Sequence, residues 1–204
     1  MKKLALVFFT LFLASGARAM DTDKFRYISM GSQDAPITIV EYTSLTCHHC
    51  ADFHLYVLPL IKQKYVTTGK LRWIIMAYPM DKDAIMAFQL VHSLPESKRE
   101  EAMSKMFSSQ KHWIGKTPEV AGKMLGLSPE QSQQAVQNKD IETALLAGSY
   151  HAQKELDVNA TPTFYMDSKK FEGAMTMEEF DKTFPALHEG EDQPAQKQVT
   201  TRLN

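Results

Sequence analysis

Two cysteines, Cys47 and Cys50, are the only ones in this 204-residue chain, and the sequence TCHHC places two histidines between them. These four side chains could form a redox-active pair, bind a metal ion, or contain a structural disulfide. Disulfide exchange needs a thiolate as nucleophile, and the free N–H groups at the N-terminus of a helix stabilise such an anion. If a helix begins at Cys47, that thiol is the nucleophile, and Cys50, one turn later, is the thiol that resolves a mixed disulfide.

The metal and structural alternatives fit the sequence less well. Structural zinc sites usually take their ligands from two separated pairs, and four consecutive residues can hardly surround one ion tetrahedrally. A disulfide that closes so short a loop contributes only roughly 2 kcal/mol in the chain-entropy model, against about 3 kcal/mol for a 15-residue loop. We therefore expect a redox pair, without a metal or another cofactor. The remaining histidines are scattered along the chain: His54, His92, His112, His151 and His188.

The segments around the cysteines predict how they are positioned. Residues 37–43, ITIVEYT, are β-branched and apolar and predict a strand. Apolar residues then recur at helical spacing over 53–61, where Pro59 is expected to kink the helix. Residues 70–77 predict a second strand. This order of strand, helix and strand places the cysteine pair at the first strand-to-helix junction.

The rest of the chain predicts a helical insertion and then a return to the sheet. Met, Ala, Gln, Glu and Lys dominate from 81 to 149, and no strand pattern stands out there. Residues 163–166 and 170–171 predict a hairpin, and the sequence from Thr176 to Glu179 is a helix capping box. The expected fold class is α/β with an inserted helical domain. The expected segments are 20–80 and 150–187 for the two parts of the sheet domain, 81–149 for the insertion, and 188–204 for a disordered polar tail.

The N-terminus, MKKLALVFFTLFLASGARA, has the layout of a secretory signal peptide. Two lysines precede a short apolar run, and Ala17-Arg18-Ala19 is a small-x-small cleavage signal. The run is too short for a membrane span, which takes about 20 residues. We therefore expect residues 1–19 to be removed and the protein to be exported to the periplasm. The mature chain then has 20 basic and 24 acidic residues and no basic run, which argues against nucleic-acid binding.

Three polar residues near the cysteines are further candidates for the site. Glu41 shares strand parity with two isoleucines, so it is expected in a buried strand, where an unpaired carboxylate is costly. It either moves protons to and from Cys50, or it is a salt-bridged or edge-exposed structural residue. His49 can stabilise a Cys47 thiolate through its charge or its N–H group. His48 is expected to be an exposed polar residue or a substrate contact.

A second motif is NATPTF, residues 159–164. Pro162 directly precedes a predicted strand, and a strand tolerates proline at its start. A cis peptide between Thr161 and Pro162 would turn the chain sharply and leave backbone groups free to pair with an extended substrate, although most X-Pro bonds are trans. The motif is therefore a candidate substrate-binding turn.

Together these segments resemble the DsbA family of thiol:disulfide oxidoreductases in the thioredoxin superfamily. The similarity covers most of the mature chain and rests on EYTSLTCHHCADFH, YVTTGKLR, LGLSPEQ and NATPTFYM followed by FEGA. The resemblance implies a thioredoxin fold in which Cys47 is the exposed nucleophile and Cys50 the buried resolving thiol. It also implies that Pro162 is cis and packs against the disulfide, with Thr161 before it. Glu41 is implied as the acidic residue below the site.

Three positions depart from the family pattern. The best-known members carry Pro-His between the cysteines, where this chain has His48 and His49. His54 replaces an acidic residue that some members carry one turn after the second cysteine. Thr161 is the residue type of isomerase-like and thioredoxin-like relatives. These departures bear on the redox potential and on the choice of substrate.

The function that the resemblance implies is disulfide donation. The protein would be a periplasmic monomer that oxidises reduced, folding exported proteins and is reoxidised by a quinone-linked membrane protein of the DsbB type. One alternative is a disulfide isomerase or reductase, and another is a non-catalytic secreted binding module. About 17 residues separate the expected cleavage site from the first predicted strand, too few for the dimerisation domain of isomerase relatives. The cysteine pair with its histidine argues against the binding module.

Overall fold

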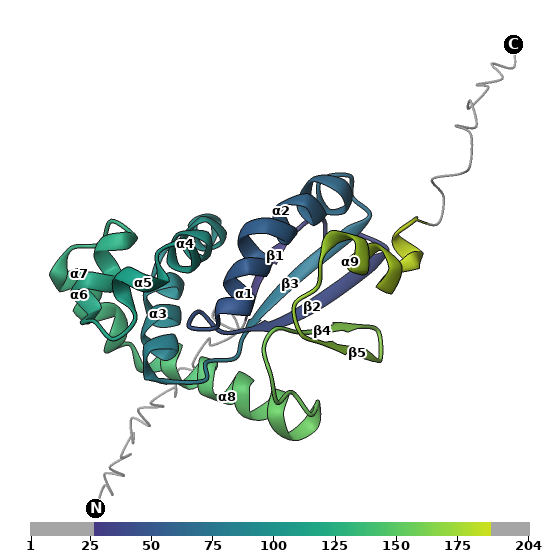
Figure 1. Cartoon of the computed structure of the whole chain (residues 1–204). Coiled ribbons are helices and arrows are strands. Elements are labelled where there is room, and N and C mark those ends of the chain that lie inside the picture. Colours follow the sequence, from purple (N-terminus) through teal and green to yellow (C-terminus); the bar gives the residue numbers. More distant parts are fainter. Residues whose placement is uncertain (1–26, 189–204) are drawn as a thin grey trace, which may run out of the picture.

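The computed structural model describes residues 27–188, which form a five-stranded sheet with helices on both faces (Figure 1). The strands lie in the order β1-β3-β2-β4-β5; β2 and β3 are parallel, and the other neighbours are antiparallel. The predicted α/β fold class is confirmed. The predicted signal peptide and residues 189–204 of the predicted tail lie outside the described residues, whereas His188, the first residue of that tail, ends a short helix. The strands are Tyr27–Met30 (β1), Ile37–Thr43 (β2), Leu71–Ala77 (β3), Thr163–Met166 (β4) and Lys169–Glu172 (β5).

The centre of the sheet is the predicted unit of strand, helix and strand. Ile37 pairs with Leu71 at one end of the parallel β2–β3 ladder, and Thr43 pairs with Ala77 at the other. The connecting helical segment changes between α-helical and π-helical geometry on both sides of Pro59, whose ring and missing N–H disturb the regular hydrogen-bond ladder. It ends at a turn in which Gly69 has φ of 77°. The helical parts are His48–Asp52 (α1), Phe53–Val57 (η2), Leu58–Ile61 (α2) and Lys62–Val66 (η3).

The edge strand β1 was not predicted. It has only four residues, YISM, and pairs antiparallel with β3, with Ile28 and Met30 buried and Tyr27 exposed. Its alternation of apolar and polar residues is too short to stand out from a loop. The expectation that the sheet begins at Ile37 was therefore wrong.

No strand falls between residues 81 and 149, all of which the structure describes, and that region is helical as predicted. Two of its helices begin directly after an N-cap residue, Thr117 and Ser128, and each has proline in its first turn. The last helix of this series, α8, runs on beneath the sheet and covers the face opposite α1, α2 and α9 (Figure 1). The helices are Lys82–Ser93 (α3), Glu96–Ser108 (α4), Gln110–Trp113 (α5), Pro118–Met124 (α6), Pro129–Val136 (α7) and Lys139–Glu155 (α8).

The C-terminal hairpin brings a second loop to the cysteine end of the sheet. Strand β4 runs antiparallel to β2, so Thr163 at its start pairs with Tyr42 near the end of β2. The loop that precedes β4 therefore lies beside the loop that follows β2. The chain closes with α9 (Met177–Thr183), which begins at the predicted Thr176 capping box, and with the short helix η4 (Pro185–His188).

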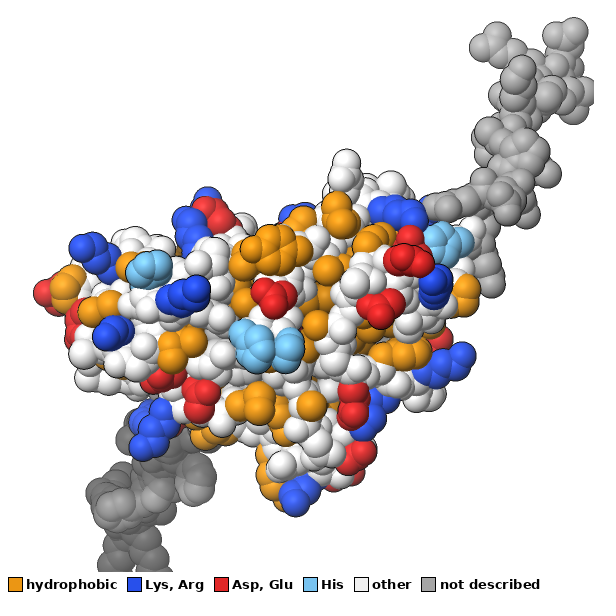
Figure 2. Space-filling model, in the orientation of Figure 1, with side chains coloured by type: hydrophobic (Ala, Val, Ile, Leu, Met, Phe, Trp, Pro, Cys, Tyr) orange, Lys and Arg blue, Asp and Glu red, His pale blue; other side chains and the backbone are white. Residues whose placement is uncertain are grey.

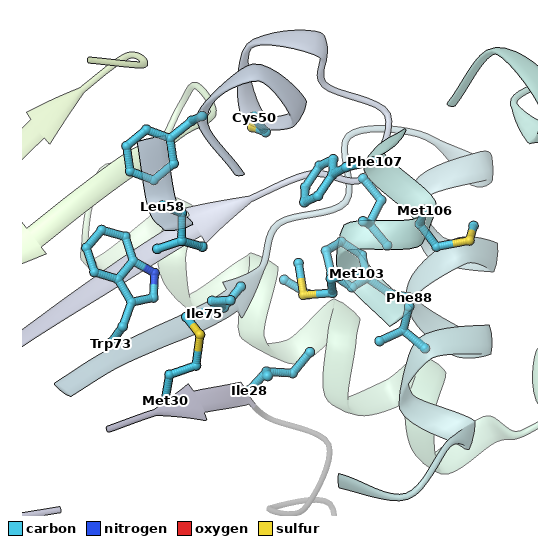
Figure 3. Packing of buried hydrophobic residues seen from close by; sticks show 14 of the residues in the cluster. Ile28, Met30, Cys50, Leu58, Trp73, Ile75, Phe88, Met103, Met106 and Phe107 are labelled. Carbon is cyan, nitrogen blue, oxygen red and sulfur yellow. The ribbon is translucent and has the colours of Figure 1, made fainter. Parts of the chain in front are cut away.

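One hydrophobic core joins the sheet to the helical region. Trp73, Phe53 and Phe164 pack together, with ring centroids 4.9 to 5.9 Å apart. Figure 3 shows this packing continue from Trp73 and Ile75 of the sheet to residues such as Phe107 of α4, with Cys50 in the same cluster. The helices are therefore anchored to the strands that hold the cysteines. Within residues 27–188, no helix is both long enough and apolar enough to cross a membrane.

Candidate active site

Cys47 occupies the position that activates a thiol. It is the N-cap of α1, and its Sγ accepts a hydrogen bond from the backbone N–H of Cys50 at 3.2 Å. The sulfur is partly exposed. The helical segment that follows thus presents its N-terminal N–H groups to this sulfur, an arrangement that favours the anion.

The loop around Cys47 is held by residues that the sequence did not indicate. Gln110 of α5 donates from Nε2 to the carbonyl oxygens of Leu45 (2.8 Å) and Cys47 (3.1 Å). Thr46 donates from Oγ1 to Oδ2 of Asp81 at 2.7 Å. The helical region therefore positions the cysteine loop directly. No local pattern could have revealed these contacts, because the partners lie 35 to 65 residues apart in the chain.

The two thiols have opposite electrostatic environments. The largest effect on the Cys47 pKa is a hydrogen bond from the Cys50 thiol, which lowers it. Partial burial acts in the opposite direction, but hydrogen bonds from Thr161 and from the backbone N–H groups of Cys50 and His49 lower the pKa further. Together these effects bring the Cys47 pKa to about 5. Cys50 is fully buried, and burial, followed by its interactions with Cys47, raises its pKa. Near neutral pH, Cys47 is therefore a thiolate and Cys50 a thiol.

The peptide bond between Thr161 and Pro162 is cis. Sγ of Cys47 lies 3.4 Å from the carbonyl oxygen of Thr161, so the predicted second motif does face the nucleophile. Pro162 is buried, and the hydroxyl of Thr161, which helps to lower the Cys47 pKa, also lies 3.3 Å from Sδ of Met80. Met80 is 58% exposed and was not predicted as part of the site; its only sequence signal is its position just after β3.

The two histidines between the cysteines are exposed. Their ring centroids lie 3.9 Å apart, so His48 and His49 face each other. Figure 2 shows a patch of histidine side chains near the middle of one face, with hydrophobic side chains around it. Among residues 27–188, no group of three or more His, Cys, Asp or Glu side chains could hold a metal ion.

Glu41 is fully buried and paired. Its Oε1 lies 2.8 Å from Nε2 of His54, and its Oε2 accepts a hydrogen bond from Nε1 of Trp73 at 3.0 Å. The sequence predicted the burial of Glu41 from strand parity and allowed for an ion-pair partner, but it identified neither partner. His54 lies four residues after Cys50, so both side chains lie on the same side of the helix. This spacing was the one signal in the sequence that His54 belongs to the site.

Thr161→Val should raise the Cys47 pKa, because valine keeps the shape of threonine but removes the hydroxyl that stabilises the thiolate. A hydrogen bond to a charged group is worth about 1.5–3 kcal/mol, so the expected rise is about 1–2 units. The ultraviolet absorbance of the thiolate, followed against pH, measures it. Thr161→Ser retains the hydroxyl and is the matched control. Equal pKa values in the valine and serine variants would contradict this assignment.

Comparison with known proteins identifies the family. A family model described as thioredoxin matches residues 23–185. The chain belongs to the thioredoxin family. Among curated proteins, it is similar to one from Rickettsia bellii that is provisionally named a protein-disulfide oxidoreductase, with 28% identity over 155 residues, 70% of this chain and 58% of that protein. The chain spans about half the length of the first curated relatives it matches.

Solved structures narrow the resemblance to the DsbA type. Wolbachia pipientis α-DsbA1 is 27% identical, with a TM-score of 0.69 over 79% of this chain and 90% of that one. BdbD from Bacillus subtilis, in its oxidised form, has a TM-score of 0.70 over 82% of this chain and 95% of that one; at 20% identity it supports the fold alone. The predicted membership in the DsbA-like thiol:disulfide oxidoreductases, with their thioredoxin fold, is confirmed.

Proposed function

We propose that this thioredoxin-family protein is a thiol:disulfide oxidoreductase that donates a Cys47–Cys50 disulfide to reduced, folding exported proteins. The observation that carries the proposal is the asymmetry of the pair: an accessible thiolate at a helix N-terminus and a buried thiol one turn later. A disulfide is a strong oxidant when its reduced form is stable, and a stabilised Cys47 thiolate stabilises the reduced form.

The reaction is two successive thiol–disulfide exchanges. A substrate thiolate attacks Sγ of Cys47, and the sulfur of Cys50 leaves and takes up a proton. A second substrate thiolate then attacks the substrate sulfur of the mixed disulfide, and Cys47 leaves as the thiolate. The substrate loses two electrons and gains a disulfide, and the protein gains two electrons and becomes a dithiol. A quinone-linked membrane protein of the DsbB type would remove these electrons.

The surrounding residues have proposed roles in these steps. Pro162 and Thr161 shape the turn against which an extended substrate lies, because the Thr161 carbonyl directly faces Cys47. The exposed thioether of Met80 and the ring of His48 provide contacts for the substrate at this opening. Glu41 serves as a proton acceptor and donor for Cys50.

The compartment and assembly are proposed from the sequence. The signal-peptide pattern of residues 1–19 supports export to the periplasm, where the disulfide can persist. We propose that the protein works as a monomer. Isomerase and non-catalytic binding functions are the alternatives that the following experiment separates.

The test is to mix the oxidised protein with a reduced, unfolded protein and to count the free thiols that remain in the substrate. We expect stoichiometric loss of substrate thiols. We also expect the equilibrium potential against glutathione to be higher than that of a cysteine pair whose nucleophilic thiol has an ordinary pKa. The Cys47 pKa is lowered from 9 to about 5. At pH 7 only the part of this shift that lies below the working pH stabilises the dithiol, which is roughly 2 pKa units. This corresponds to a potential higher by about 60 mV, before solvent screening. A strongly reducing potential with refolding of scrambled disulfides would favour the isomerase, and no exchange at all would favour the binding module.

His49 is proposed to act on Cys47 through its backbone N–H, because its imidazole is exposed and faces His48. His49→Ala keeps that N–H, so we expect a smaller rise in the Cys47 pKa than Thr161→Val produces. His48→Ala is the matched control for loss of an exposed ring. Thiolate titration measures all three variants. A rise for His49→Ala that equals or exceeds the rise for Thr161→Val would assign the effect to the imidazole.

A further inference from the structure

The buried pair of Glu41 and His54 lies between the sheet and the helical region. Glu41 comes from β2, His54 from η2, and Trp73, the third partner, from β3. The Trp73 ring nitrogen can only donate, so it fixes one carboxyl oxygen as an acceptor. The other oxygen lies 2.8 Å from Nε2 of His54, which can be donor or acceptor depending on the tautomer. His54 is therefore the one of these two partners that can both give a proton to Glu41 and take one from it.

A small cavity lies beside the histidine. Its volume is about 170 Å³, enough for several water molecules, since one needs roughly 10–15 Å³ of such volume. His54 lines this cavity and Glu41 does not; the lining also includes Ser104, Lys62 and Glu100. The Lys62 and Glu100 side chains form an ion pair and are each about 40% exposed, so they lie at the opening to solvent.

The pair is connected to the buried thiol on the side of the strand. Thr43 lies two residues after Glu41 in β2, so both side chains point to the same face of the sheet. Its hydroxyl is buried and has no hydrogen-bond partner among the described residues, and the Thr43 side chain is near enough to Cys50 to lower the pKa of that thiol slightly against the larger effect of burial. Thr43 is thus an unpartnered hydroxyl on the strand face that carries the carboxyl group, next to the thiol that must gain or lose a proton.

We propose that His54 is a positioning residue that carries protons between buried Glu41 and the solvent-facing cavity. When Cys50 leaves as a thiolate, it takes one proton from Glu41 by way of the Thr43 hydroxyl. His54 returns a proton to Glu41 from Nε2, and the other ring nitrogen takes one from water in the cavity. The net result is one proton moved from solvent to Cys50. The coupling to Cys50 rests on the proposed function, whereas the exchange between Glu41 and His54 does not.

The charged groups facing this route are few. Lys62 of η3 and Glu100 of α4 lie at the cavity, and their charges offset each other. Phe107 of α4 covers the His54 ring, with centroids 4.4 Å apart, and Phe53 lies on another side at 6.2 Å. The titratable groups of the route are therefore Cys50, Glu41 and His54, with the Lys62–Glu100 pair at its mouth.

The test removes the histidine and then supplies its chemistry from solution. His54→Ala should slow the release of Cys50, measured by stopped-flow during disulfide transfer to a small dithiol, by roughly 100-fold at neutral pH, the low end for positioned proton transfer. Imidazole should restore the rate, with a pH profile that follows the added base. Pyrrole, which has the same size and no basic nitrogen, should not. Restoration by pyrrole, or an unchanged rate in His54→Ala, would overturn the proposal and leave His54 a packing residue.

A second measurement needs no activity. In the oxidised protein, the nitrogen NMR signals of the His54 ring report which ring nitrogen carries the proton, and Glu41→Gln should change that tautomer. A His54 tautomer that is the same in the wild type and in Glu41→Gln would overturn the shared-proton route. If the wild-type protein transferred no disulfide, the proposed function would fail while this measurement still tested the route. His112→Ala, an exposed histidine on α5, is the control for unrelated signals.

Discussion

Cys47→Ser protein should transfer no disulfide to a reduced substrate, and Cys50→Ala protein should accumulate mixed disulfides. In the first variant, the sole accessible sulfur of the pair is gone, and Cys50 is fully buried. In the second, the Cys47 thiolate still attacks a disulfide of a partner and forms a mixed disulfide, releasing one partner thiol, but no thiol remains one turn away to displace the bound partner. Electrophoresis without reductant detects the adducts, and free-thiol counts measure transfer.

The Cys50→Ala variant should also have a changed Cys47 pKa. The hydrogen bond from Cys50 is the largest effect that lowers the Cys47 pKa, so its loss should raise that pKa above about 5. The bonds from Thr161 and from the backbone remain, and they should keep it below the value for an ordinary thiol. The trap should therefore still form near neutral pH. Transfer by Cys47→Ser, or the absence of adducts in Cys50→Ala, would refute the assignment of nucleophile and resolving thiol.

The cysteine pair could be located from sequence because its surroundings are defined locally. A β-branched run predicts β2, and the periodic apolar residues that follow predict the helix, so the junction at Cys47 needs no long-range information. Strand parity likewise predicted that Glu41 is buried. These features depend on residues within about ten positions of each other in the chain.

The missing parts of the site all depend on contacts between distant segments. Gln110 holds the loop of Cys47 from α5, and the partner of Glu41 on β3 is Trp73, 32 residues away. Met80 joins the site because its loop meets Thr161, 81 residues later. A single sequence does not show which polar side chains meet across a fold, because hydrogen bonds between such residues leave no periodic pattern.

The reduced protein should gain stability relative to the oxidised protein as pH rises from 5 to 7. The folded-state pKa of Cys47, about 5, lies below its ordinary value of 9.0. Between these two values, the unfolded reduced chain binds more protons at this thiol than the folded one, so stability increases with pH. This contribution is complete above about pH 9 and is lost as pH falls through about 5. The oxidised protein has no thiol at this position and lacks the contribution.

The size of the effect follows from the pH interval. Two pH units correspond to about 2.7 kcal/mol, and the partial exposure of the sulfur reduces this to about 1–2 kcal/mol through solvent screening. Urea unfolding of both redox forms at pH 5 and pH 7 gives the difference directly, and groups that titrate alike in both forms cancel. Cys47→Ser, which cannot form the thiolate, should show no such pH dependence. A gap between the redox forms that stays constant from pH 5 to pH 7 would mean that the Cys47 thiolate is not stabilised by the fold, and the oxidising character proposed for the pair would then have no electrostatic source.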